Sequence, residues 1–186
     1  DANILNEKKT QIVKALGYDA TVSYDDVVAE AALLNAEGVA VENDTQKVFD
    51  ALQSVKDSRA AGQFPIFKAK NGSVVVPLYG AGLWGPIWGY VSLNDDKATV
   101  YGAYFAHAGE TPGLGADIAL PKFQNQFPGK KISREGEFTS IAIVKPGKTD
   151  DTKDYVNGIS GGTITSQGVD AMLLEGLGQY VNFLKQ

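Results

Sequence analysis

The sequence of 186 residues contains no cysteine, one histidine and one methionine. Without cysteine the chain forms no disulfide, holds no iron–sulfur cluster through thiolates and has no thiol nucleophile. The only histidine, His107, has no histidine or carboxylate partner at ligand spacing. We therefore interpret His107 as structural and expect no metal site.

Clusters of basic residues are also missing. The formal net charge is -5, the isoelectric point is about 4.9, and lysine and arginine are scattered along the chain. A nucleic-acid partner is therefore not expected. With 44% hydrophobic and 21% charged residues, the composition is that of a globular protein, and the length fits one domain or one domain with an appendage.

One stretch, residues 73–94, carries no charge and is long enough to cross a membrane as a helix. Pro77, Pro86 and several glycines would interrupt such a helix repeatedly. We interpret the stretch as a strand, a glycine-rich loop and a second strand.

Helices are predicted in the N-terminal third. Residues 3–16 show a loose apolar stripe that ends at Gly17. Ser23, followed by two aspartates, is a good N-cap for a helix that would extend to about Asn35. A third, short helix is expected after Asp44, with apolar residues at helical spacing.

From Phe64 the pattern changes to that of strands. Residues 64–69 and 73–78 are rich in apolar and β-branched residues and flank Asn71-Gly72. This dipeptide is typical of a two-residue hairpin, because both residues tolerate positive φ.

The rest of the chain completes an α+β pattern. A second hairpin is predicted from residues 86–93 and 99–107, then a helix near 116–126 and a strand at 138–144. After Gln167, apolar residues recur every three or four positions, as in an amphipathic helix. The predicted fold is an antiparallel sheet of four to five strands, packed with N-terminal helices and a closing C-terminal helix.

The segment 160–166, Ser-Gly-Gly-Thr-Ile-Thr-Ser, leads into that last helix. Glycines before a helix N-terminus let the backbone approach an anion, and the first turn offers unpaired N–H groups. Read alone, however, Thr165 and Ser166 most often would only cap the helix. A capping box is absent, because Val169 stands where glutamate or glutamine would be needed.

Residues 156–166 resemble the flavinylation motif of the FMN-binding domain family, roughly D-G-x-S-G-A-T-x-T-S. In that family the last threonine of the motif carries FMN through a phosphoester, and the matching residue here is Thr165. Asn157 stands in place of the usual aspartate and Gly162 in place of the usual alanine. The resemblance implies covalent FMN on Thr165, attached by a flavin transferase.

Two further segments strengthen the resemblance. Glu110-Thr-Pro-Gly-Leu-Gly115 and Gly80-Ala-Gly-Leu-Trp84 occur in this order before the threonine motif. Together the three segments look like the covalent-flavin subunit of the bacterial Na+-translocating NADH:quinone reductase, over residues 65–184. The resemblance implies an electron-carrying member of a membrane complex that oxidises NADH, reduces quinone and moves sodium.

The implied flavin site draws on all three segments. Leu83 and Trp84 would form an apolar wall for the flavin ring, Thr111 would meet its polar edge, and Leu114 would pack on the ring. Alternatively, Trp84 and Trp88 are core or edge residues of the sheet, and Glu110 is a surface carboxylate. The residues expected at the flavin are Ser160, Gly161, Gly162, Thr163, Thr165, Leu83, Trp84, Glu110, Thr111, Leu114 and Gly115.

The resemblance also implies a setting. The chain starts with Asp1 and its only methionine is Met172, so we interpret it as lacking a removed membrane anchor. We expect an N-terminal helical region at 1–55 and an FMN-binding domain at 56–186, on the periplasmic side of the bacterial inner membrane. Other subunits of the reductase would be its partners. Direct NADH or quinone binding is not expected, because no G-x-G-x-x-G follows a strand.

Three alternatives remain. The first is the corresponding flavin subunit of the ion-translocating ferredoxin:NAD oxidoreductase complex, which shares the FMN motif and tends to have a shorter soluble part. The second is a non-redox sensor or assembly module of the same fold, in which segment 160–166 only caps a helix. The third, a soluble flavin reductase, is disfavoured because the sequence shows no His/Arg acid–base constellation.

Overall fold

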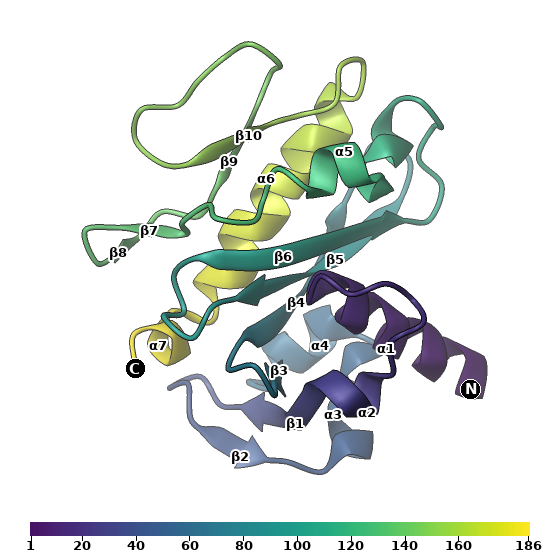
Figure 1. Cartoon of the computed structure of the whole chain (residues 1–186), viewed down its shortest axis with the longest axis vertical. Helices are drawn as coiled ribbons and strands as arrows, with labels where there is room; N and C mark the ends of the chain where they lie inside the picture. The colour runs from purple at the N-terminus through teal and green to yellow at the C-terminus, as the bar shows by residue number, and fades with distance from the viewer.

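The two predicted hairpins form the centre of the sheet in the computed structural model, which describes all 186 residues. Six antiparallel strands follow the order β2-β1-β3-β4-β5-β6 (Figure 1). The central strands are β3 (Phe64–Ala69), β4 (Val74–Ala81), β5 (Pro86–Leu93) and β6 (Val100–His107). The α+β prediction is confirmed, and residues 73–94 form strand, loop and strand as expected.

The turn between β3 and β4 differs from the predicted two-residue turn. Gly72 has φ +92°, whereas Asn71 is not among the residues with positive φ. The amide of Gly72 donates to the carbonyl of Ala69, and the Asn71 side chain accepts the amide of Ser73. The turn therefore has glycine alone in the left-handed conformation.

The helix predicted from Ser23 to about Asn35 is wrong after its first turn. Only α2 (Tyr24–Val27) is helical, and β1 (Val28–Leu34) and β2 (Ala40–Glu42) follow it. The alanines and leucines of β1 favour helix intrinsically. Pairing with β3 along its length and burial of both its faces override that preference, which is why the sheet has six strands rather than four or five.

Side chains that alternate along the strands supply two separate cores. Val74, Val76 and Leu78 of β4 face one core, and Val75 faces the other. Because successive strand residues point to opposite faces, a strand buried on both faces reads as a continuous apolar run. The sheet is therefore the middle of three layers.

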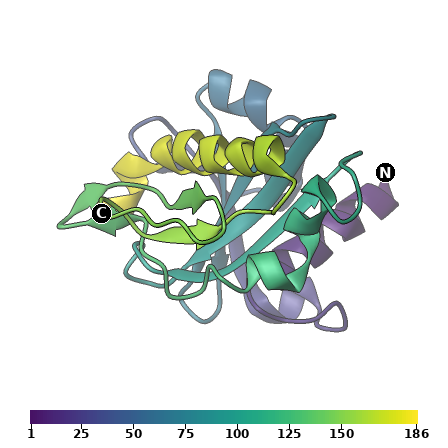
Figure 2. The same cartoon turned by 90° about the horizontal axis from the view of Figure 1, so that it is seen from above.

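Helices cover each face of the sheet (Figure 2). α1 (Ala2–Ala15) and α3 (Thr45–Leu52) belong to the core that includes Val75, and α4 (Val55–Ala60) follows α3. α6 (Thr163–Gly178) and α7 (Val181–Leu184) pack on the opposite core. The N-terminal and C-terminal helices thus lie on different faces. None of the helices combines the length and the apolar character needed to span a membrane.

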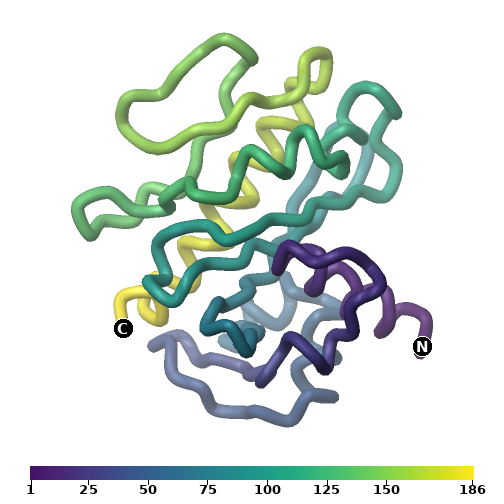
Figure 3. The backbone as a smooth tube through the Cα atoms, in the orientation of Figure 1, coloured from purple at the N-terminus to yellow at the C-terminus, as the bar shows by residue number.

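The segment between β6 and α6 is less regular than predicted (Figure 3). The helix expected near 116–126 is divided into η1 (Gly115–Ala119) and α5 (Pro121–Gln124), because Pro121 lacks an amide proton and begins a new helix. The strand expected at 138–144 is interrupted at Ser140, whose φ is +61°. Its parts join two small sheets formed by β7 (Ser133–Arg134) with β8 (Glu137–Phe138) and by β9 (Ala142–Val144) with β10 (Tyr155–Asn157).

The division of the chain at residue 55 stays a prediction. The N-terminal region contributes β1 and β2 to the same sheet as the later strands. Any boundary at residue 55 would therefore cross a shared sheet.

Gly168 sets the distance between α6 and β4. A Cβ at this glycine would lie 2.2 Å from the carbonyl oxygen of Ala81. We expect Gly168→Ala to lower the free energy of unfolding by about 2 kcal/mol, because backbone must move away from the added methyl group. Denaturant unfolding measures this change.

Gly178→Ala is the matched control for Gly168→Ala in the same helix. Its Cβ would meet only a Phe138 side-chain atom, at an ordinary 3.5 Å. We expect a change within about 0.5 kcal/mol. Equal destabilisation by the two variants would show that contact with Ala81 is not what makes Gly168 sensitive.

Candidate functional site

Three segments that are far apart in the sequence meet at one carboxylate. Glu110 Oε1 accepts hydrogen bonds from Thr165 Oγ1 at 2.5 Å and from the amide of Leu83 at 2.7 Å. Glu110 Oε2 accepts from the amide of Trp84 at 2.9 Å. The turn after β4, the loop after β6 and the first turn of α6 are thereby joined, as the resemblance implied.

Glu110 is buried, so the surface interpretation of this residue is wrong. Burial alone would raise the pKa of its carboxyl group, but the hydrogen bonds from Thr165, Trp84 and Leu83 outweigh burial and hold that pKa below its ordinary value. The carboxyl group is therefore ionised at neutral pH. A buried, fully bonded carboxylate fixes the positions of the groups that donate to it.

His107 supports Glu110 from the end of β6. Its Nδ1 accepts the amide of Glu110 at 3.0 Å, which is the structural role predicted for it. No group of three or more histidine, aspartate or glutamate side chains is arranged to hold a metal ion.

Glycines make the close packing around Thr165 and Glu110 possible. A Cβ at Gly115 would lie 2.3 Å from Thr165 Oγ1, and a Cβ at Gly82 would lie 2.3 Å from Glu110 Oε1. Gly161 has φ +75°, and a Cβ there would lie 2.7 Å from a methyl group of Leu114. A larger residue at any of these positions would separate the three segments.

The start of α6 lies earlier than the sequence predicted. Gly162 is the N-cap residue and α6 begins at Thr163, so Thr165 and Ser166 lie inside the first turns rather than before the helix. Ser166 Oγ accepts the amide of Ile159 at 2.9 Å, which fixes the preceding loop instead of capping the helix. The simple N-cap interpretation of these two residues is therefore wrong.

Large apolar side chains surround the Glu110 carboxylate on the outside of the molecule. Trp84 is 69% exposed, and Leu83, Leu114 and Ile164 are between 41% and 53% exposed. We call these four residues the apolar rim. Trp84 is not a core residue, whereas Trp88 is half-buried on β5 and donates to Gln11 on α1.

The remaining predicted residues lie in the same three segments. Thr111 has an exposed side chain, and its carbonyl accepts the amides of Leu114 and Ala116. Ser160, Gly161 and Thr163 are exposed, whereas Gly162, Gly115 and Thr165 are buried. Sequence reasoning missed Ile164, because an apolar residue between two threonines of a motif carries no signal of exposure.

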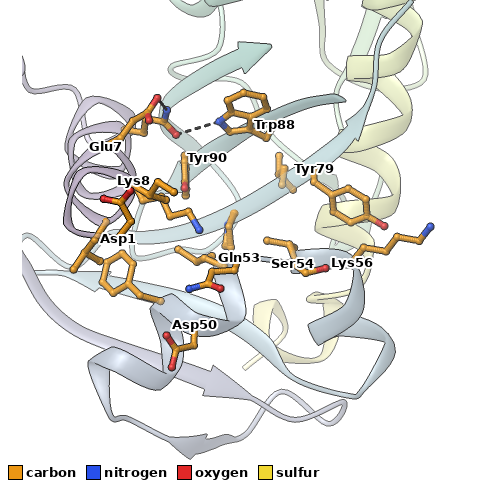
Figure 4. A pocket seen from close by; sticks show the side chains of 18 of the residues that line it. Asp1, Glu7, Lys8, Asp50, Gln53, Ser54, Lys56, Tyr79, Trp88 and Tyr90 are labelled. Atoms are coloured by element: carbon orange, nitrogen blue, oxygen red, sulfur yellow. Dashed lines mark hydrogen bonds between the residues drawn. The ribbon is translucent and has the colours of Figure 1, made fainter. Parts of the chain in front are cut away.

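The largest cavity is on the opposite side of the sheet. It measures about 950 Å³ and lies among α1, α3, β4 and β5 (Figure 4). Trp88 and Tyr90 form part of its wall, and burial lowers the pKa of Lys8. None of the predicted flavin residues lines this cavity.

Comparison with known proteins identifies the family. The FMN-binding domain family matches residues 82–178, about half of the chain. The NqrC protein of Vibrio anguillarum, a component of the Na+-translocating NADH-quinone reductase, is 31% identical over 90% of this chain and 74% of its own length. This chain is a member of the NqrC family.

Other NqrC proteins agree with this assignment. The Pasteurella multocida protein is 36% identical over 88% of this chain, which spans 58% of that relative's length. The crystal structure of the Parabacteroides distasonis protein has a TM-score of 0.90 and 46% identity, covering 97% of this chain and 92% of that one. Shewanella oneidensis NqrC has a TM-score of 0.77 and 25% identity, covering 100% of this chain and 99% of its own.

The NqrC assignment confirms the family predicted from the three motifs. The similar proteins all belong to the Na+-translocating reductase, so the flavin subunit of the ferredoxin-linked complex is not favoured. The FMN-binding match contains both the Glu110–Gly115 loop and the threonine motif. The chain is therefore an FMN-binding subunit of a membrane complex.

Proposed function

We propose that this chain carries FMN as a phosphoester on Thr165 and passes electrons within the Na+-translocating NADH-quinone reductase. The observation that carries the proposal is the meeting of the three motif segments at Glu110 and Thr165. When bound, FMN supplies the redox chemistry, and the protein supplies attachment, orientation and surroundings.

The residues fit a flavin phosphate. The first turn of α6 presents the positive end of a helix of 16 residues, which favours an anion. The exposed Gly161 lies directly before the N-cap Gly162, so the backbone is open to close approach on that side. A phosphate on a first-turn threonine would be stabilised by amides that have no partner within the helix.

The apolar rim fits the flavin ring. The isoalloxazine system is flat and largely apolar, with polar edges, so it needs aliphatic or aromatic surface together with backbone groups. Leu83, Trp84 and Leu114 supply such surface close to Thr165. Their exposure leaves the bound ring near the protein surface, where another electron carrier can approach.

Covalent attachment explains how such an open site keeps its cofactor. A phosphoester makes the local concentration of FMN independent of its affinity for the protein. This would matter on the periplasmic side of the inner membrane, where we place the domain and where dissociated FMN would be lost. The other subunits of the reductase would supply NADH oxidation, quinone reduction and sodium transport.

Peptide mapping tests the proposal. The chain is expressed together with a flavin transferase and digested, and the peptides are analysed by mass spectrometry. We expect the mass of FMN less water on the peptide that contains Thr165, and yellow colour that survives denaturation. An unmodified chain, with the same transferase active on a known acceptor protein, would contradict the attachment. The non-redox module would then explain the fold better.

A further inference from the structure

The hydroxyl group expected to receive the flavin is the least accessible one in its segment. Thr165 is 2% exposed, whereas Ser160 and Thr163 have exposed side chains. Gly115 packs directly against Thr165 Oγ1, where even a Cβ atom would lie at 2.3 Å. The bare protein thus leaves no room for a phosphate at this oxygen.

Glu110 holds the hydroxyl in this closed position. Thr165 Oγ1 donates its proton to Glu110 Oε1, and the same carboxylate is fixed by the amides of Leu83 and Trp84. A hydrogen bond to an ionised acceptor is about twice as strong as a neutral one. The hydroxyl is therefore held in the protein interior by a carboxylate that is itself held by backbone.

Esterification is incompatible with this hydrogen bond. An ester oxygen has no proton to donate, and a phosphodiester would bring a second negative charge close to the Glu110 carboxylate. Like charges at such a distance inside a protein repel strongly. The Thr165–Glu110 hydrogen bond must therefore break before or during attachment.

We infer that Glu110 is a latch that closes the modification site of the bare protein, so that flavin attachment proceeds through an open form in which the Thr165–Glu110 hydrogen bond is broken. In the open form Thr165 Oγ bonds to the phosphorus of a flavin dinucleotide, and the bond from that phosphorus to the nucleoside monophosphate breaks. The hydroxyl proton passes to the transferase or to solvent, and nothing is oxidised or reduced. This inference rests on the proposed function of Thr165.

Glu110→Ala tests the latch. We measure the initial rate of flavin transfer from flavin adenine dinucleotide, with catalytic transferase and limiting acceptor, by the fluorescence of the denatured product. Removal of one hydrogen bond to a charged acceptor should increase the open population, and hence the rate, about tenfold. A rate equal to or lower than that of the unsubstituted chain would overturn the inference.

Asp117→Ala is the matched control. Asp117 lies in the same loop region and accepts the amide of Gly113, but it has no hydrogen bond to Thr165. The same loss of charge should leave the transfer rate unchanged. A rise as large as that of Glu110→Ala would assign the effect to loop loosening or charge, not to the latch.

Hydrogen exchange gives a readout that does not depend on transfer. In the bare protein the amides of Leu83 and Trp84 are bonded to Glu110, so they should exchange slowly. Glu110→Ala and the milder Glu110→Gln should lose this protection while circular dichroism shows that the sheet is kept. Unchanged protection in both variants would show that Glu110 does not hold the site closed.

The latch and the proposed function fail in different ways. If the unsubstituted chain never receives flavin at Thr165, the proposed function is wrong. If it is modified there, but both Glu110 variants are modified more slowly, only the latch is wrong. Gly115→Ala is a further check, because its methyl group would displace the hydroxyl sterically and should also raise the initial rate.

Discussion

Thr165→Ala is expected to abolish covalent flavin attachment. The substitution removes the only atom of residue 165 that can form a phosphoester and leaves the rest of the motif intact. It also removes one donor to Glu110, at a cost of about 1–3 kcal/mol in stability. Intact mass and fluorescence of the denatured protein after incubation with transferase measure the loss.

Two variants frame the result for Thr165→Ala. Thr163→Ala removes an exposed hydroxyl from the same helical turn and should leave attachment unaffected. Thr165→Ser keeps a hydroxyl at the same position and should still accept the flavin. Continued labelling of Thr165→Ala would move the attachment to another hydroxyl, and peptide mapping would identify it.

Phe105→Ala is expected to have the largest effect on stability. Phe105 on β6 is fully buried, and its ring centroid lies 5.7 Å from that of Phe123 and 5.1 Å from that of Phe127. Truncation removes this contact and leaves a cavity between β6 and α5, lowering the free energy of unfolding by about 4 kcal/mol. Denaturant unfolding followed by circular dichroism measures it.

Tyr101→Ala is the control for the same strand. Tyr101 is 41% exposed, so its truncation removes little buried surface and should cost less than about 1 kcal/mol. A similar loss in both variants would mean that the effect reflects strand propensity and not packing of the three phenylalanines. A small loss for Phe105→Ala would show that α5 closes over the cavity.

Local patterns predicted much of the fold. The hairpin β5–β6 and the helices α1, α3 and α6 follow from strand-like runs, turn residues, caps and helical spacing, all of which are local in sequence. β1 could not be predicted in this way, because its residues favour helix and only its pairing with β3 makes it a strand. The turn at Gly72 needed the backbone angles of both strands.

The candidate site shows the same limit. The motifs and the family resemblance indicated which segments would meet, and all of them do. That Glu110 would be the buried centre was left open, because a glutamate in an irregular loop has no local signal for burial. The closed state of Thr165 depends on Gly115 and Glu110, which lie about 50 residues away in sequence.

The wide separation of Gly82, Glu110 and Thr165 along the chain has a consequence for the order of folding. Contacts between distant residues form more slowly than hairpins, because a longer loop must be closed first. The β4–β5 and β5–β6 hairpins should therefore form before α6 packs on β4. A newly made chain would expose Thr165 before Glu110 can bind it, and maturation by the transferase would compete with the last folding step.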